Sequence, residues 1–188
     1  MLAKRIIACL DVRSGRVVKG QQFRELRDAG SPQRCAARYC EQGVDEIVML
    51  DVAATLEDRI ACLSTVRAIA REIDVPLTVG GGVRSLDDIE SLLEAGADKV
   101  SINSAAAENP QILSDAAARY GRQSIVLAID ARRSDGQVDV ATHSATKAAD
   151  RDVCAWATAG ERFGAGELLL TAVERDGSNL GYDLELIT

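Results

Sequence analysis

Two stretches of the chain repeat the same residue pattern, and this repeat limits the folds that the chain can adopt. Residues 5–18 and 124–138 each contain a short apolar run, rich in β-branched residues, that ends on an aspartate, Asp11 or Asp130. A Ser-Gly or Asp-Gly turn follows in each copy, and then a second β-prone stretch. Continuous apolar runs bounded by turn residues are typical of strands buried on both faces of a sheet.

The rest of the chain alternates between strand and helix patterns, which favours a parallel sheet with helices outside it. Strands are expected at residues 5–11, 46–51, 75–79, 98–103, 124–130 and 166–171, and helices at 32–43, 56–73, 85–96, 110–120 and 151–163. Ser85 and Asp88 have the spacing of a capping box at the start of the third of these helices. The polar stretch that ends at Gly30 is expected to form a mobile loop over a site. Residues 43–50 also recur as residues 164–171, at nearly the offset of the two aspartates.

A repeat of this length implies a two-fold design in which each half has four βα units. An eight-stranded βα barrel takes ~250 residues, and this chain has 188. We therefore expect an α/β fold of the (βα)8 TIM-barrel family with about six of the eight units present. Residues 1–188 would form one incomplete barrel domain with an internal half-barrel repeat.

The repeated aspartates are the first candidates for catalysis. A residue at the carboxyl end of a buried parallel strand lies at the rim of the sheet, where α/β folds bind ligands. The repeat predicts that Asp11 and Asp130 face one pocket, whereas two solvated loop aspartates would be the alternative. Because His143 is the only histidine, we expect no multi-histidine metal site, and acid–base chemistry falls to carboxylates or a lysine.

Composition excludes several classes of protein. A chain with 47% hydrophobic residues is not disordered, and a net charge of −7 argues against nucleic-acid partners and anionic membranes. We expect no membrane span and no signal peptide. The five cysteines form no CxxC pair, which indicates reduced, mostly buried thiols in a cytoplasmic protein.

Two turns have the composition of phosphate-binding sites. Gly80-Gly81-Gly82 follows a strand directly, and its backbone N–H groups can approach a phosphate closely. Asn103-Ser104 opens a strand-to-helix turn. Either turn alone could be only a tight turn, but together they favour a phosphate cradle. Asp176-Gly177-Ser178 is a weaker candidate for a second cradle.

Charged residues open four of the expected strands. These residues are Arg5, Glu46, Lys99 and Glu167. Two cations and two anions at the amino ends of barrel strands would form a paired ring at the barrel floor. Four solvated charges are the alternative.

The motifs resemble, along the whole chain, those of the cyclase subunits of imidazole glycerol phosphate synthase in histidine biosynthesis. The matching segments are residues 5–11, 19–20, 50–51, 80–82, 98–104, 128–130, 164–171, 174–177 and 181–183. The resemblance implies a (βα)8 barrel without a cofactor that forms a heterodimer with a glutaminase. With ammonia from that partner, the family splits a bisphosphate, phosphoribulosyl-formimino-aminoimidazole carboxamide ribonucleotide. The products are imidazole glycerol phosphate and aminoimidazole carboxamide ribonucleotide.

The resemblance also implies roles for individual residues. The catalytic pair would be Asp11 and Asp130. Substrate or phosphate contacts would be Lys19, Gly82, Asn103, Ser104, Thr171, Asp176 and Gly177. The ammonia gate would be Arg5, Glu46, Lys99 and Glu167, and the glutaminase would contact Asp98 and Gln123.

Three features depart from the family pattern. Residues 141–150 lack the usual glycines, Glu174 replaces a shorter acid, and the segments for strands seven and eight are absent. Two alternatives therefore stay open, namely the sister isomerase of the same pathway and a non-catalytic remnant that binds phosphate or a partner. We expect the 188-residue chain alone to be inactive and to associate through strands one and six, which would be unpaired edges.

Overall fold

The computed structural model describes residues 3–21, 24–134 and 137–187, and the chain divides into two compact units. Unit 1 contains the chain up to Val18 together with Asp28–Ser101. Unit 2 contains Lys19–Arg27 together with the chain from Ile102 onward. Each unit is built on parallel strands with helices packed beside them, as the alternating pattern predicts.

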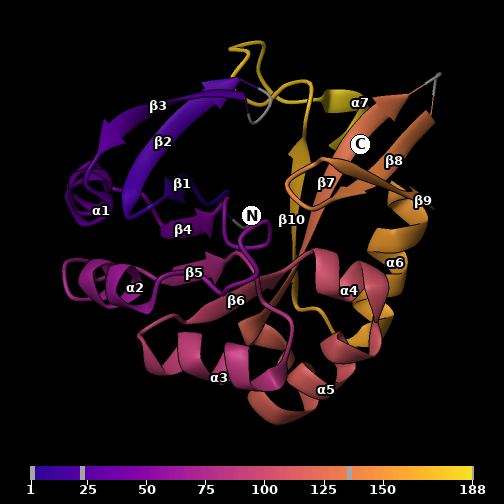
Figure 1. Ribbon diagram of the computed structural model, residues 1–188, viewed down its shortest axis with the longest axis horizontal. Coiled ribbons are helices and arrows are strands. Elements are labelled where there is room, and N and C mark those ends of the chain that lie inside the picture. The colour runs from indigo at the N-terminus through magenta and orange to yellow at the C-terminus, as the bar shows by residue number, and fades with distance from the viewer. Residues whose placement is uncertain (1–2, 22–23, 135–136, 188) are drawn as a thin grey trace. The chain divides into compact units, whose positions relative to one another are not determined.

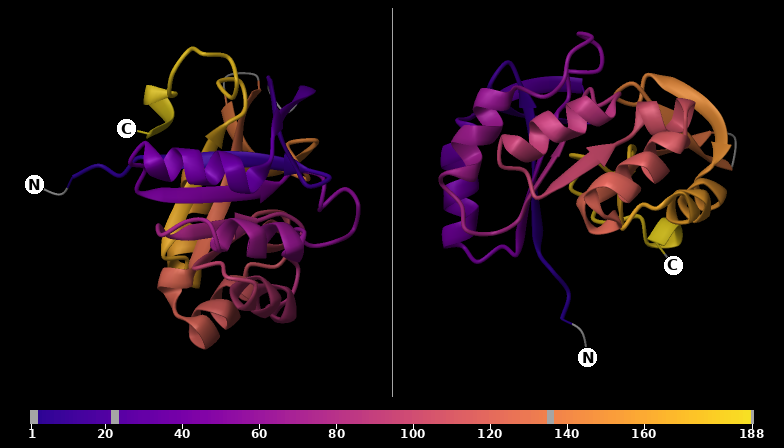
Figure 2. Two further views of the ribbon diagram at one scale, coloured as in Figure 1. Left: turned by 90° about the vertical axis from the view of Figure 1, so that its left-hand side faces the viewer. Right: turned by 90° about the horizontal axis from the view of Figure 1, so that it is seen from below.

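Unit 1 is organised around four adjacent parallel strands. In spatial order they are β1 (Ile7–Arg13), β4 (Glu46–Asp51), β5 (Leu77–Gly80) and β6 (Lys99–Ile102). Three helices lie in a row along them, α1 (Pro32–Glu41), α2 (Leu63–Ala70) and α3 (Leu86–Glu94) (Figures 1 and 2). The apolar side chains of β4 and β5 are almost all buried, as expected for strands covered on both faces.

The stretch expected to be a mobile loop is instead a pair of strands, β2 (Arg16–Gln21) and β3 (Arg24–Gly30). β2 pairs antiparallel with β1 and lies beside β3. Arg16 makes two hydrogen bonds to Asp28, at 2.9 and 3.1 Å, and these lower the pKa of the Asp28 carboxyl. The prediction failed because β3 is mostly polar, with Leu26 and Ala29 as its only apolar side chains, and is held by backbone and charge pairing.

From Ile102 onward, the described residues of unit 2 form four strands after the end of β6. β7 (Ile125–Ser134) pairs in parallel with β10 (Glu167–Ala172), and β8 (Gln137–Thr142) pairs antiparallel with β7 and with β9 (Lys147–Asp152). The helical segments are α4 (Ser104–Glu108), α5 (Gln111–Tyr120), the 3₁₀ turn η1 (Arg122–Ser124), α6 (Val153–Phe163) and α7 (Leu184–Ile187). Helices α5 and α6 pack on β7, and α6 also packs on β8 and β9 (Figure 1).

The two aspartates occupy equivalent positions, but the strands do not end at them. Asp11 pairs in register with Leu50 of β4, and β1 then continues as one arm of the hairpin with β2. Asp130 pairs with Thr171 of β10, and β7 likewise continues as one arm of a hairpin with β8. Each aspartate therefore lies where parallel pairing gives way to a hairpin. The expected Asp135-Gly136 turn lies outside the described residues.

Other elements differ from the expected bounds. α2 is shorter than the expected helix because residues 52–61 form a turn-rich segment ahead of it. Residues 147–152 form strand β9, so α6 starts later than expected, at Val153, where the Asp152 side chain accepts a hydrogen bond from Ala155 N–H at 2.7 Å. α4 was not expected as a separate helix. The remaining strands and helices lie close to their expected bounds.

The cysteines are free, but the expectation that most are buried is wrong. Cys9, Cys62 and Cys154 are exposed, while Cys35 and Cys40 are half-buried. Cys154, for example, lies near the start of α6 on its solvent side. Within the described part of the chain, no helix combines the length and the apolar character that crossing a bilayer requires.

The predicted capping box of α3 is confirmed and can be tested directly. The Ser85 side chain accepts from Asp88 N–H at 3.1 Å, and the Asp88 side chain accepts from Ser85 N–H at 3.0 Å. Replacing Ser85 with Ala should lower the free energy of unfolding by about 1 kcal/mol in a urea titration, because a helix N–H loses its acceptor. Ser91→Ala, in the same helix but away from its cap, is the control and should change stability by only a few tenths of that. Equal effects of the two changes would contradict a capping role.

Candidate functional site

A buried carboxylate lies at the amino ends of the unit 1 strands. Glu46 is 2% exposed, and its Oε2 atom accepts from Arg5 at 3.0 Å and from Lys99 Nζ at 2.9 Å. Its Oε1 atom accepts from the Thr78 hydroxyl at 2.6 Å. These contacts involve the segment before β1 and strands β4, β5 and β6, so one carboxylate links all four strand starts.

Three of the four predicted gate residues therefore form one cluster. Lys99 is 12% exposed and Arg5 is 51% exposed, so the cluster extends from the buried carboxylate to solvent. The alternative of separate solvated charges is wrong for Glu46 and Lys99. Glu167, the fourth predicted member, is the first residue of β10 in unit 2, in register with Val126. The sequence pattern did not indicate Thr78, whose hydroxyl donates the third side-chain hydrogen bond to this carboxylate.

The two predicted partner-contact residues are both exposed and both lie near strand starts. Asp98 directly precedes β6 and accepts from Leu77 N–H at 2.8 Å. Gln123 lies in η1 just before β7, and its side-chain amide donates to the Tyr120 carbonyl at 3.3 Å. Each residue lies at the same end of its own unit's strands as the predicted gate residues of that unit.

The other predicted residues of unit 2 gather at the opposite end of β7. The Asn103 amide donates to Asp130 Oδ2 at 3.0 Å, and Asp130 is 9% exposed. Thr171 is the register partner of Asp130. The other side-chain atom of Asn103, the oxygen Oδ1, is buried and has no hydrogen-bond partner among the described residues. The structure therefore gives Asn103 a contact with the predicted catalytic carboxylate that the sequence did not indicate.

Ser104 also has a partner that the sequence did not indicate. Its hydroxyl accepts from the His143 backbone N–H at 3.0 Å. His143, Ser144 and Ala145 all have positive φ, at 53°, 54° and 59°, a conformation that favours glycine. This is the segment where the expected family glycines are absent, and it forms a turn between β8 and β9. The turn therefore stores backbone strain next to a predicted phosphate contact.

Two further predicted ligand contacts form a pair within unit 2. Lys19 Nζ lies 3.6 Å from Asp176 Oδ1. The lysine side chain is 61% exposed and the aspartate 23% exposed, so the pair is solvated and adds little to stability. Gly177, with a φ of 66°, follows in the same loop. The structure thus brings the predicted loop lysine and the predicted second cradle together.

At the carboxyl ends of the unit 1 strands, Asp51 is buried, 3% exposed, and binds Arg59 through hydrogen bonds of 2.7 and 3.1 Å. These bonds raise the pKa of the Arg59 guanidinium further above its ordinary value. The half-buried Asp11 lies on β1, next to Val12, which is in register with Asp51. Gly82, the predicted phosphate contact, donates its N–H to the Thr55 hydroxyl at 3.2 Å. The sequence pattern did not indicate that Asp51, Arg59 and Thr55 lie next to this turn.

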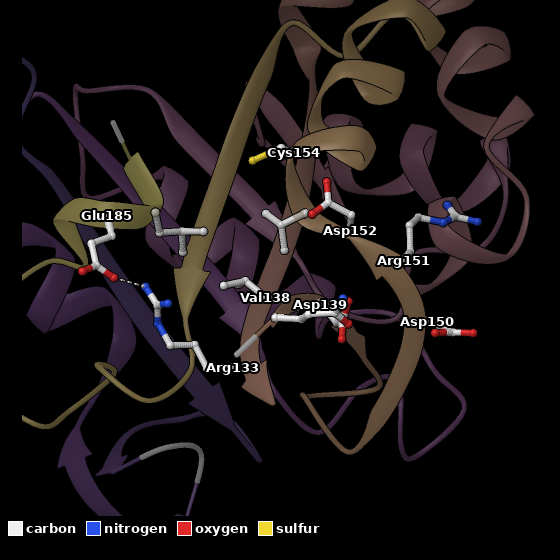
Figure 3. Close-up of a pocket in the computed structure, with 11 residues that line it drawn as sticks. Arg133, Val138, Asp139, Asp150, Arg151, Asp152, Cys154 and Glu185 are labelled. Carbon is white, nitrogen blue, oxygen red and sulfur yellow. Dashed lines mark hydrogen bonds and ion pairs between the residues drawn. The ribbon is translucent and has the colours of Figure 1, made fainter. Parts of the chain in front are cut away.

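A separate hollow of about 560 Å³ lies along β8, β9 and the start of α6 (Figure 3). None of the predicted site residues lines it. Its two arginines are engaged by the protein, because Arg133 binds Asp183 and Glu185 and Arg151 lies over the Trp156 ring at 4.3 Å. Among the described residues, no group of three or more His, Cys, Asp or Glu side chains is placed to hold a metal ion.

The hydrogen bond from Thr78 to Glu46 should contribute measurably to the stability of the protein. Thr78→Val preserves the shape of the side chain but removes the hydroxyl donor, so the buried carboxylate loses one of its hydrogen bonds. The free energy of unfolding should fall by about 1–3 kcal/mol, as measured by urea denaturation. Thr78→Ser retains the hydroxyl and should lose less. A Thr78→Val protein as stable as the Ser variant would show that the hydrogen bond contributes nothing.

The sequence of the chain is similar to those of known proteins of one family. The family described as "Histidine biosynthesis protein" matches residues 5–188. The protein named "Imidazole glycerol phosphate synthase subunit HisF" from Dehalococcoides mccartyi strain 195 is 53% identical over 186 residues, which cover 99% of this chain and 74% of that protein. The protein of the same name from strain CBDB1 of that species is 52% identical over the same shares.

Proposed function

Since the chain belongs to the histidine biosynthesis protein family, we propose that it is the cyclase subunit of imidazole glycerol phosphate synthase. The family is one of (βα)8 barrels, so the fold class expected from the sequence is confirmed. The observation that carries the proposal is the 53% identity to a subunit of that name, over 99% of this chain. In the proposed reaction, ammonia converts the open-chain ribonucleotide into imidazole glycerol phosphate and aminoimidazole carboxamide ribonucleotide.

Asp11 and Asp130 act as the general acid and general base in this proposal. Closure of the imidazole ring moves several protons, and two positioned carboxylates suit such a reaction. The hydrogen bond from Asn103 fixes the orientation of the Asp130 carboxylate, which is what proton transfer at a set position requires. The equivalent junctions of parallel strand and hairpin support a matched pair.

The amides and hydroxyls near the strand ends hold the two phosphates of the substrate. The Ser104 hydroxyl, at the start of α4, and the Gly82 amide serve the first phosphate. The second phosphate lies near Lys19, Asp176 and Gly177, where the exposed lysine supplies the positive charge. Thr171 lies beside Asp130 in register and contacts the part of the substrate between the phosphates.

Ammonia enters from the opposite end of the strands in this proposal. A glutaminase subunit docks there and contacts Asp98 and Gln123, and Arg5, Glu46, Lys99 and Glu167 form the gate. Arg5 is 51% exposed and extends the buried Glu46–Lys99 pair toward solvent, which supports a gate at the surface. We infer that the enzyme works in the cytoplasm, where the exposed free cysteines stay reduced.

The aspartate assignment makes the first functional prediction. In the context of a complete barrel, Asp11→Asn or Asp130→Asn should lower kcat with free ammonium by about a hundredfold or more, with little change in substrate binding, because each change removes a proton-transfer group. Product formation would be followed by chromatography. Asp115→Asn, on the outer face of α5, is the matched control and should retain wild-type turnover. Near-normal kcat in both site variants would rule out the acid–base pair.

The ammonia gate makes the second functional prediction. Lys99→Ala should change glutamine-dependent turnover, measured with the glutaminase bound, by a different factor from turnover with free ammonium. The reason is that only the first route passes the charged cluster. Lys99→Arg retains the charge and should show a smaller difference between the two assays. Equal factors in both assays would mean that Lys99 has only a structural role.

A further inference from the structure

We propose that Thr55 sets the phosphate affinity of the Gly82 turn by occupying the Gly82 amide in the ligand-free protein. This inference rests on the proposed function in one respect, because that function assigns Gly82 to phosphate. The new element is that phosphate must compete with the Thr55 hydroxyl for the Gly82 amide. All the residues that carry the argument lie in unit 1.

The segment Val52–Ala61 lies directly on the glycine turn. Gly82 N–H donates to Thr55 Oγ1 at 3.2 Å, and Ala61 N–H donates to the Gly81 carbonyl at 3.0 Å. A Cβ atom added to Gly82 would lie 1.7 Å from the Arg59 carbonyl oxygen. Gly82 therefore has two reasons to be glycine, a φ of +69° and the close approach of this segment.

The contacts that hold the segment Val52–Ala61 differ in strength. The Arg59 guanidinium makes two hydrogen bonds to the buried Asp51 carboxylate and a third to the Ile60 carbonyl. Charge-assisted bonds of this kind are about twice as strong as neutral ones. The contact between Thr55 and Gly82, by contrast, is a single neutral hydrogen bond. Arg59 therefore fixes the segment, and the Thr55 hydroxyl is the part that a ligand can displace.

A phosphate oxygen is a stronger acceptor than the threonine hydroxyl. It carries negative charge, so its hydrogen bond from the Gly82 amide is charge-assisted. Gly82 is buried, so its amide has no ready replacement partner in bulk solvent. The Thr55 hydroxyl thus accepts the hydrogen bond of the Gly82 amide while no phosphate is bound. When phosphate binds, it replaces the hydroxyl as the acceptor.

This exchange has a thermodynamic consequence. The ligand gains its bond to Gly82 only at the expense of the bond between Gly82 and Thr55, so the hydroxyl lowers the apparent affinity. Removing the hydroxyl leaves the amide unsatisfied in the free protein, and that cost disappears when phosphate binds. Loss of the Thr55 hydroxyl should therefore weaken the empty protein and strengthen phosphate binding together.

The test compares Thr55→Val with Thr55→Ser by calorimetric titration with inorganic phosphate. Thr55→Val should bind phosphate about tenfold more tightly than the parent protein and should melt at a lower temperature when phosphate is absent. Thr55→Ser retains the hydroxyl and should have parental affinity. Hydrogen exchange at the Gly82 amide should be faster in Thr55→Val and should slow on addition of phosphate.

Several results would overturn the inference. They are unchanged or weaker phosphate binding by Thr55→Val, no phosphate protection of the Gly82 amide, and no binding to any of the three proteins. The proposed function is tested separately by cyclase turnover. Turnover with an unchanged phosphate affinity in Thr55→Val removes this inference alone. Tighter phosphate binding by a protein without cyclase turnover removes the function but leaves the exchange at Gly82 standing.

Discussion

The buried carboxylate of Glu46 is the constraint on which the arrangement of unit 1 depends. A lone carboxylate in such a place would be strongly destabilising, so its partners are obligatory. They come from the segment before β1, from β5 and from β6. Their strands are in fixed register, with Ile7 beside Glu46 and Thr78 beside Lys99. A shift of any one strand by one residue would turn its partner away from the carboxylate.

A second constraint operates at the other end of the strands, where parallel pairing changes to a hairpin. Extension of β1 and β7 beyond their aspartates places Asp11 and Asp130 within hydrogen-bonded strands instead of on free loops. A side chain on such a backbone has few alternative positions, which suits an acid or base that must meet a proton at a set place. Both units have this junction of a parallel strand with a hairpin, and the two junctions correspond to the two copies of the sequence repeat.

Sequence patterns predicted what depends on neighbouring residues and missed what depends on distant ones. The apolar runs of β4 and β7 and the capping box of α3 are local signals, and all three are confirmed. Strands β3 and β9 are mostly polar and depend on pairing with a neighbouring strand. The charges at strand starts were visible in the sequence, but Thr78 meets Glu46 across 32 positions and Gly82 meets Thr55 across 27. No periodicity encodes such contacts, so these site partners became visible only in the fold.

Two candidate ligand contacts, Asn103 Oδ1 and the Gly82 amide, differ in whether the ligand-free protein already satisfies them, and this difference affects binding. The Asn103 oxygen is buried without a partner among the described residues, so a substrate N–H that reaches it meets no competitor and relieves an existing cost. The Gly82 amide already has an acceptor in Thr55, so a phosphate gains only the difference between two hydrogen bonds. Binding energy would thus come more from the atoms beside Asp130 than from this glycine turn. That distribution favours a substrate whose reacting part, rather than its phosphate alone, makes the decisive contact.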